Sequence, residues 1–214
     1  MATIVFSAST LAIAGCAAGT GTTSPSASAS PTKTAVAGGP VAACVVGDWT
    51  STEVSAQASS ASASGSINGG GEVLVKIAST GKTDVDFSAM QPVKFSASAL
   101  GTNVKGQFVY AGKASGQIRT GDATSMSGIW EPVGTADWSA VKVTVELTEP
   151  VQAKPFENLP IANLTVDGMA QTGGVVDVDP LLGKGKYECG TGTLILSPDD
   201  GKGMTWKLTR KSDK

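Results

Sequence analysis

Hydrophobic and polar residues alternate along most of the chain from residue 44 onward. The clearest run covers residues 141–147, where Val141, Val143 and Val145 share one parity and Lys142 and Thr144 the other. A period of two is typical of β-strands with one buried and one solvated face. The same alternation recurs in residues 73–77, 85–87, 93–95, 104–110, 194–196 and 206–208.

Short polar segments rich in glycine separate these runs and predict tight reversals of the chain. They fall at residues 79–82, 100–103, 111–113, 120–122 and 199–201. The segment closest to an amphipathic helix is Val54–Ser64, and its serine content favours a mobile loop equally. We therefore expect about eight to ten short strands in an all-β sandwich or a closed, antiparallel up-and-down barrel. Closure is favoured because it removes exposed strand edges.

The N-terminus carries a different pattern, since residues 2–15 contain no charged side chain and are mostly small or apolar. They end in Ile13-Ala14-Gly15-Cys16, which resembles a bacterial lipobox. The resemblance implies that residues 1–15 are a lipoprotein signal peptide and that the thiol of Cys16 receives a diacylglycerol, a lasting two-chain anchor. Because only the α-amino group of Met1 is positive in this segment, we expect the natural start to lie upstream.

Residues 17–43 contain one charged residue, Lys33, together with many Ser, Thr, Ala and Pro residues. Such a segment buries too little apolar surface to offset its chain entropy, so residues 16–43 are predicted to be a disordered tether. Residues 44–214 then form the β-barrel domain. This order is similar to that of Gram-positive and actinobacterial lipoproteins, which places the domain on the extracytoplasmic face of the bacterial cell membrane.

Composition limits the possible functions of this domain. The 214 residues suit one domain with a tail. A formal net charge of −2 argues against a nucleic-acid partner, which would require a basic face. The chain has no histidine, which excludes Ser-His-Asp and Cys-His nucleophiles and histidine-ligated metal sites.

Two of the three cysteines remain if Cys16 is lipidated, namely Cys44 and Cys189. In an exported protein such a pair usually forms a disulfide. Closing so long a loop is worth about 4–5 kcal/mol in the chain-entropy model. A redox-active pair would favour a close Cys-x-x-Cys spacing, which the sequence lacks.

Gly47-Asp48-Trp49 stands at the start of the first predicted strand and Arg210 at the end of the last. This pair resembles the lipocalin and wider calycin barrels, in which a Gly-x-Trp indole closes one barrel end beneath an arginine. The resemblance implies a stacked Trp49–Arg210 pair and a flexible lid at residues 54–70. The Thr-Asp-Tyr motif of core lipocalins is missing, and Trp49 as an ordinary core aromatic with Arg210 as a surface charge is the alternative.

The end of the chain extends this resemblance to uncharacterised lipocalin-like lipoproteins of actinobacteria. They end similarly in a Tyr-x-Cys followed by Leu-rich and Trp-containing strands. The corresponding residues here are Tyr187-Glu188-Cys189, Leu194-Ile195-Leu196 and Trp206.

No group of residues predicts catalysis, a metal site or a cofactor, so we expect no enzyme. The acidic stretch Asp177-Val178-Asp179-Pro180, with Asp167 upstream, lacks the loop of a calcium site. Asp84 and Asp86 suit the wet face of a hairpin. A Ser-x-x-Lys match at residues 79–82 falls in a turn rather than at a helix start. Four glutamates could in principle serve a glycosidase, but aromatic residues make up only 5% of the chain; these are Glu131, Glu146, Glu149 and Glu157.

Two functions remain. In the first, the barrel binds a small apolar or amphiphilic ligand, such as an envelope lipid, in its interior. Parity places six candidate lumen residues inside, which a filled core would show equally: Phe87, Phe95, Phe108, Tyr110, Val143 and Val145. In the second, a solid barrel acts as a structural or interaction module through an exposed apolar patch at Trp130–Val133 or Pro155–Phe156.

Overall fold

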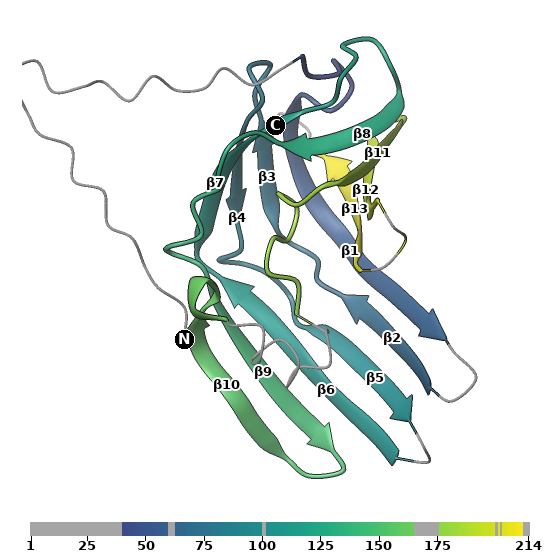
Figure 1. The fold of residues 1–214 in the computed structure, drawn as a ribbon, viewed down its shortest axis with the longest axis vertical. Helices are drawn as coiled ribbons and strands as arrows, with labels where there is room; N and C mark the ends of the chain where they lie inside the picture. Colours follow the sequence, from purple (N-terminus) through teal and green to yellow (C-terminus); the bar gives the residue numbers. More distant parts are fainter. Residues whose placement is uncertain are drawn as a thin grey trace, which may run out of the picture. The chain divides into compact units, whose positions relative to one another are not determined.

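A computed structural model describes residues 40–59, 63–99, 102–164, 176–199, 201 and 203–211 (Figure 1). The predicted signal peptide, Cys16 and nearly all of the tether lie outside these residues. Within the described ranges the fold is all-β, and no helix is long and apolar enough to cross a membrane. The strands are β1 (Gly47–Ser59), β2 (Ala63–Gly69), β3 (Leu74–Ile77), β4 (Lys82–Asp86), β5 (Val93–Ala99), β6 (Thr102–Ala111), β7 (Lys113–Arg119), β8 (Ser127–Pro132), β9 (Lys142–Glu149), β10 (Ala153–Pro160), β11 (Gly185–Gly190), β12 (Thr193–Pro198) and β13 (Thr205–Arg210), with a 3₁₀ turn, η1, at Ile161–Asn163.

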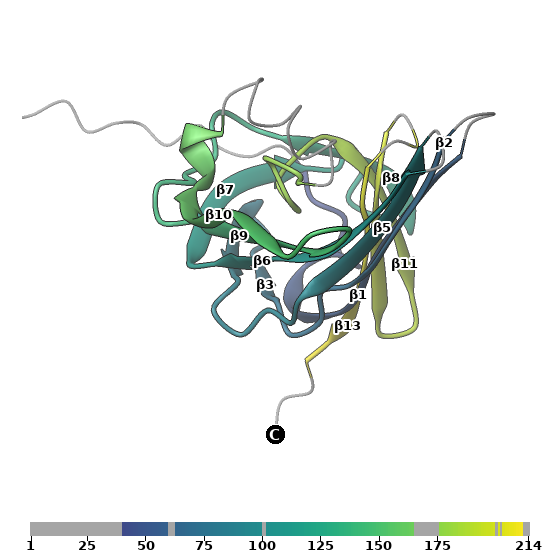
Figure 2. The same ribbon diagram turned by 90° about the horizontal axis from the view of Figure 1, so that it is seen from below.

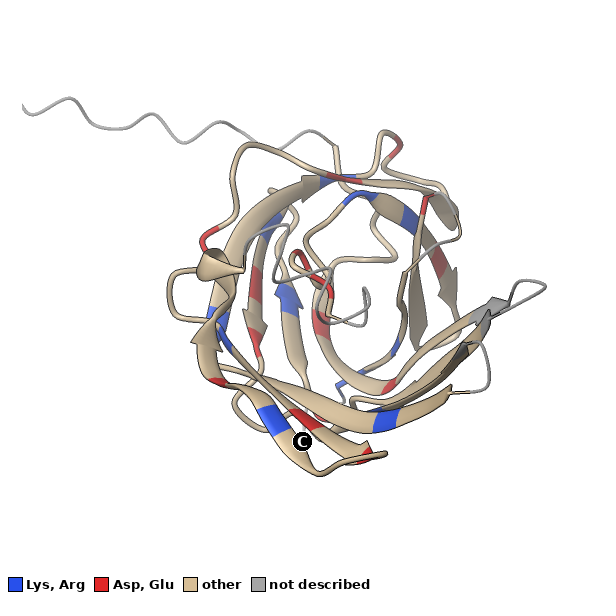
Figure 3. Cartoon of the chain, turned by 60° about the horizontal axis from the view of Figure 1, so that its bottom comes forward, with Lys and Arg blue, Asp and Glu red and all other residues tan. Residues whose placement is uncertain are grey.

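Eight of these strands close into an antiparallel barrel, as the alternating pattern predicts. The ring runs β1-β13-β12-β11-β8-β7-β4-β3 and returns to β1 through the β1–β3 pairing. Each strand of the ring therefore has a hydrogen-bonded neighbour on both sides, which removes the exposed edges. Figure 3 looks into the ring and shows acidic and basic residues interspersed around it.

The barrel is closed at one end and open at the other, because β1 changes its hydrogen-bonded neighbour along one edge. We call the end where β1 pairs with β3 the closed half, and the end where β1 pairs with β2 the open half. Gly47–Thr50 pair with β3, whereas Val54–Ser59 pair with β2. From β2 the sheet continues through β5, β6 and β9 to β10, which is an edge strand. Two prolines, Pro155 and Pro160, lie in this edge strand, where missing N–H groups cost the sheet least.

Residues 111–113 are a bend rather than the predicted reversal. β6 lies between β5 and β9, and β7 lies between β4 and β8, so the two strands are parts of one long path joined at Gly112. Gly112 has a φ of 97°, and a Cβ there would overlap the carbonyl oxygen of Ala140. Glycine therefore redirects the strand from the open half to the closed half.

The predicted lid at residues 54–70 is wrong, because most of this segment is strand. β1 extends to Ser59 and β2 begins at Ala63, and the two pair from Val54–Gly69 to Ser59–Ser64. Pairing with β13 and β5 on the outer sides holds this Ser- and Ala-rich hairpin in the sheet. Tertiary pairing thus overrides the weak intrinsic β-propensity of serine and alanine.

The residues before β11, which we call the bridging segment (residues 176–184), lie across the open half of the barrel. In Figure 2 this yellow-green segment lies between the β9–β10 hairpin and β8. The hydroxyl of Tyr110 in β6 donates to the carbonyl of Asp177 at 2.7 Å and accepts from its N–H at 2.9 Å. Nε1 of Trp130 in β8 donates to the carbonyl of Leu181 at 3.1 Å. The segment is therefore anchored to strands on two sides.

Candidate ligand-binding site

A cavity of about 540 Å³ lies between the bridging segment, β2 and the β11–β13 strands. Its wall is mainly apolar, and its rim carries acidic and basic side chains. The volume falls within the roughly 300–1,000 Å³ of typical small-molecule sites. The apolar side chains that line it are Ile67, Trp130, Val176, Leu181, Leu196, Met204 and Trp206.

Two adjacent strands supply the inner wall of the cavity. Leu196 of β12 is the register partner of Trp206 of β13, so the two side chains lie side by side on the inner face. Both are buried, and Trp206 is only 2% exposed. Nε1 of Trp206 is also buried, and it has no hydrogen-bond partner within the described part of the chain. This side of the cavity therefore carries a donor that the described fold leaves unsatisfied.

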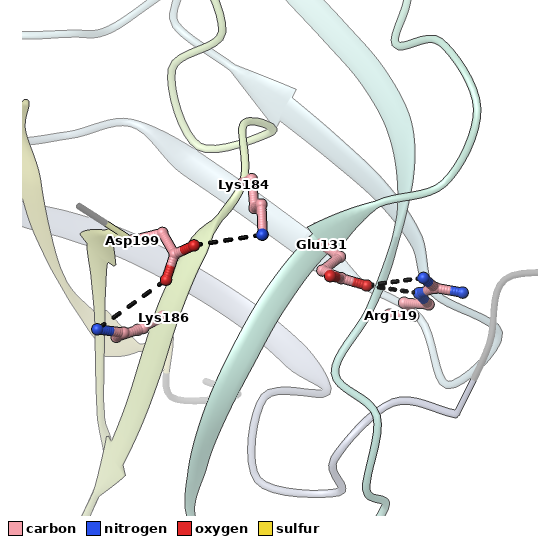
Figure 4. A network of polar contacts seen from close by, with 5 residues as sticks. All are labelled: Arg119, Glu131, Lys184, Lys186 and Asp199. Carbon is pink, nitrogen blue, oxygen red and sulfur yellow. Dashed lines mark hydrogen bonds and ion pairs between the residues drawn. The ribbon is translucent and has the colours of Figure 1, made fainter.

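Two lysines and one aspartate form an ion-paired group on part of the rim (Figure 4). The carboxylate of Asp199 lies 3.3 Å from Nζ of Lys184 and 4.0 Å from Nζ of Lys186. These side chains are about half exposed, so each pair contributes little to stability. Their effect is to engage both lysines of the rim with a single carboxylate.

Asp177 and Asp179 occupy another part of the rim, in the bridging segment. Asp177 is half-buried, and its Oδ1 accepts the N–H of Asp179 at 2.9 Å. Burial raises the pKa of the Asp177 carboxyl, and the nearby charge of Asp179 raises it further. Among the ion pairs of the described residues, none involves either carboxylate.

Tyr110 links this rim to the core. The ring is buried beneath the bridging segment, with ring centroids 5.5 Å from those of Phe87 and Phe108. Burial raises the pKa of the Tyr110 hydroxyl well above its ordinary value, and the charge of Asp177 adds to that effect. The hydroxyl therefore stays protonated, as its hydrogen bond to the Asp177 carbonyl requires.

The six residues predicted to face the lumen all point inward and are buried, and they form part of one packed core. None of them is among the residues lining the cavity. The structure therefore brings them together as filling of the barrel, with Tyr110 as the one that touches the bridging segment. Those six residues are Phe87, Phe95, Phe108, Tyr110, Val143 and Val145.

The predicted Trp49–Arg210 pair closes the opposite end of the barrel. The Arg210 guanidinium carbon lies 4.3 Å from the centroid of the Trp49 ring. Its two terminal nitrogens donate to the carbonyls of Val46 at 2.9 Å and Cys44 at 3.0 Å. Gly47 has a φ of 139°, and a Cβ there would overlap the guanidinium, which explains the glycine of the Gly-x-Trp motif.

The same end holds the predicted cysteine pair. Cys44 and Cys189 form a disulfide, with Cα atoms 6.2 Å apart and a sequence separation of 145. Val41 and Ala42 are buried as well, so the packed core extends upstream of the predicted boundary at residue 44.

The predicted apolar patch at Trp130–Val133 is absent, because Trp130 is buried in the cavity wall and only Pro132 of the remaining three is fully exposed. At Pro155–Phe156, Pro155 is exposed and Phe156 is half-buried against the core. Large apolar side chains that are exposed include Met126 and Ile129, next to and within β8.

Several of the other acidic residues considered in the sequence are ion-paired. Across the described ranges, no group of three or more acidic or cysteine side chains could hold a metal ion. Glu131 pairs with Arg119 at 2.8 Å (Figure 4), and Glu146 pairs with Lys154. Asp84 and Asp86 pair with Lys82 and Lys113 and line a groove of about 570 Å³ beside β1, β3, β4 and β7.

The cavity as a whole could not be predicted from the sequence, although the inward orientation of some of its lining residues could. The alternation in residues 194–196 and 206–208 predicts that Leu196 and Trp206 point inward, and both are buried. The position of Asp177 and Asp179 over that wall depends on the bridging segment. No local pattern could have indicated it, since its anchors lie in β6 and β8.

The fold and the cavity define the class of protein: an antiparallel eight-stranded barrel with one partly open half. No known family, no curated protein and no solved structure matches the chain.

Proposed function

We propose that this protein is a membrane-anchored, lipocalin-like barrel that binds a small apolar or amphiphilic ligand. The observation that carries the proposal is the cavity beneath the bridging segment, with an apolar wall that includes two indoles and a charged rim. Such a combination suits a molecule with an apolar body and a polar end.

The distribution of side chains supports this location for the ligand. The closed half is filled by large buried residues, among them Trp49, Tyr187 and Leu208. An eight-stranded barrel has room for side chains or for one small ligand, but not for both at the same level. The space for a ligand therefore lies in the open half.

The binding part of the proposal is tested with residues Val36–Lys214, which form one compact unit. This unit is exported from an actinobacterial host, and its bound molecules are measured by native mass spectrometry before and after denaturation. We compare Ile67→Trp, which fills the cavity from β2, with Ile129→Trp on the exposed face of β8.

We expect a stoichiometric small molecule in the wild type and in Ile129→Trp, and its loss in Ile67→Trp. A folded domain that is empty in every preparation, and that binds no alkyl amphiphile in titrations, would contradict ligand binding. The surface around Met126 and Ile129 would then be the place to test for a protein partner.

The anchoring part rests on the lipobox sequence ending in Cys16. Expressed with its N-terminal segment, the chain is expected to enter the membrane fraction and to incorporate labelled fatty acid. Cys16→Ser is expected to abolish both without changing the domain. Fatty-acid label retained by Cys16→Ser would contradict lipidation at this residue.

A further inference from the structure

The charges at the rim of the cavity are unequally compensated. Lys184 and Lys186 both face Asp199, so these three side chains form one connected group (Figure 4). Asp177 and Asp179 carry two further negative charges on the same rim. Among the described residues that line the cavity, three carboxylates and two ammonium groups leave one negative charge in excess.

The geometry of the bridging segment keeps this negative charge in place. The N–H and the carbonyl of Asp177 are both hydrogen-bonded to the Tyr110 hydroxyl, so the backbone cannot move the carboxylate away without breaking two partly buried hydrogen bonds. The carboxylate accepts one N–H, from Asp179, and is half-buried. A half-buried carboxylate without a cation is an unfavourable arrangement that a cationic partner would relieve.

A second, independent observation also indicates a bound molecule at this cavity. The indole of Trp206 lines it, is 2% exposed, and has no acceptor for Nε1 within the described ranges. A buried donor without a partner costs stability, and a polar atom of a ligand can remove that cost.

We propose that the ligand is an amphiphile with a cationic amine head and an oxygen acceptor in its body. Asp177 and Asp179 hold the head at the rim, the acceptor meets Nε1 of Trp206, and the apolar part lies against Leu196. This inference rests on the proposed function and adds the chemical class of the ligand. A phosphate or carboxylate head is disfavoured at this rim. Such a head would face Asp177 and Asp179, and the two lysines that could attract it already share Asp199.

The test uses three probes with the same alkyl chain, each below its micelle concentration: dodecylammonium, dodecyl phosphate and uncharged dodecyl glucoside. Affinity for residues Val36–Lys214 is measured by calorimetry at low and at physiological salt. The variants are Asp177→Asn and Asp177→Asn/Asp179→Asn, and the matched control is Asp48→Asn, an exposed aspartate outside the cavity. Circular dichroism confirms that each variant is folded.

We expect dodecylammonium to bind about tenfold more tightly than the glucoside, and the phosphate more weakly than both, with a preference that shrinks as salt rises. The double variant is expected to lose about tenfold in affinity for dodecylammonium. Its affinity for the glucoside, and every affinity of Asp48→Asn, should stay within about twofold.

Failure of the inference is distinguishable from failure of the proposed function. Glucoside binding with no preference for ammonium, or with a preference for phosphate, would overturn the cationic class and leave the binding function intact. An ammonium preference that survives in the double variant would overturn the role of the two aspartates. Binding of none of the three probes would overturn both proposals.

Discussion

Arg210 shows that an exposed residue can be structural. The residue is exposed, yet its guanidinium lies on the buried Trp49 ring and bonds to two carbonyls of the segment before β1. The planar fork matches two acceptors at once, which a lysine ammonium cannot do. Arg210 therefore links the last strand, β13, to the segment that leads into β1.

Arg210→Ala is expected to lower the free energy of unfolding by about 1–2 kcal/mol, through the lost cation–π contact and two charge-assisted hydrogen bonds. Urea denaturation of the variant against the wild type measures this loss. Lys211→Ala, at the neighbouring exposed lysine, should change stability by less than about 0.5 kcal/mol. Equal effects of the two substitutions would contradict the specific role of Arg210.

Asp177→Asn is expected to raise the free energy of unfolding at neutral pH. The pKa of Asp177 is raised in the folded state, mainly by burial. The stability linked to its proton is therefore complete below the unfolded pKa and is lost as pH rises through the folded pKa. The difference between variant and wild type should grow from acid toward neutral pH in urea titrations. A variant that is less stable than the wild type at neutral pH would contradict this sign.

Residue patterns predicted some of these features and not others. Trp49, Arg210 and the cysteine pair were identifiable because a motif and a count of cysteines point to them. The role of Asp177 was not, since the acidic stretch looks like any solvated loop in the sequence. Its position over an apolar wall arises only from hydrogen bonds to Tyr110, which lies 67 residues away along the chain.

At the level of elements, strands were predictable where large side chains alternate and unpredictable where small ones do. β9 follows its pattern, with Val143 and Val145 inward. The Ser- and Ala-rich hairpin of β1 and β2 has few large residues to mark its faces, so its strands are defined by pairing with β13 and β5. Pairing partners are a tertiary property that local composition does not encode.

The bridging segment depends on Tyr110 more than on any local preference of its own. Tyr110→Phe removes one hydroxyl but leaves both the N–H and the carbonyl of Asp177 without that partner. We expect a loss of about 1–3 kcal/mol and faster amide hydrogen exchange in residues 176–184. Hydrogen-exchange mass spectrometry measures the second effect peptide by peptide.

Tyr187→Phe is the matched control, because its hydroxyl donates to the carbonyl of Ser125 at 3.2 Å rather than to the bridging segment. It should leave exchange in the bridging segment unchanged. Equal protection of this segment from hydrogen exchange in Tyr110→Phe and in the wild type would show that the Tyr110 hydroxyl does not hold the bridging segment in place.

At the scale of the whole molecule, the alternation and the turn signals sufficed for a closed antiparallel barrel. They did not reveal that the strands bend and change partners between the closed and the open half. The division into two halves depends on the bend at Gly112 and on the pairing of β1 with β3 at one end and with β2 at the other. The cavity lies in the open half that this division creates.

The Cys44–Cys189 disulfide closes a loop of 145 residues and should be a main source of global stability. Replacing both cysteines by alanine is expected to lower the free energy of unfolding by about 2–5 kcal/mol. Guanidinium titrations of the oxidised wild type, the reduced wild type and the double variant measure it. Denaturation midpoints of the reduced wild type and the double variant that equal the midpoint of the oxidised wild type would contradict this expectation.

The same disulfide determines how the domain responds to a mechanical pull on the chain ahead of Pro40. The pull first loads the hydrogen bonds of Pro40 and Ala43 to residues 120 and 123. It then reaches Cys44, where a covalent bond passes the load to β11 as well as to β1. Two strands from opposite ends of the sequence share the force, so β1 cannot be peeled from the barrel alone. Under the proposed anchoring through Cys16, a pull on the chain would load this end of the barrel and leave the cavity in the open half unloaded.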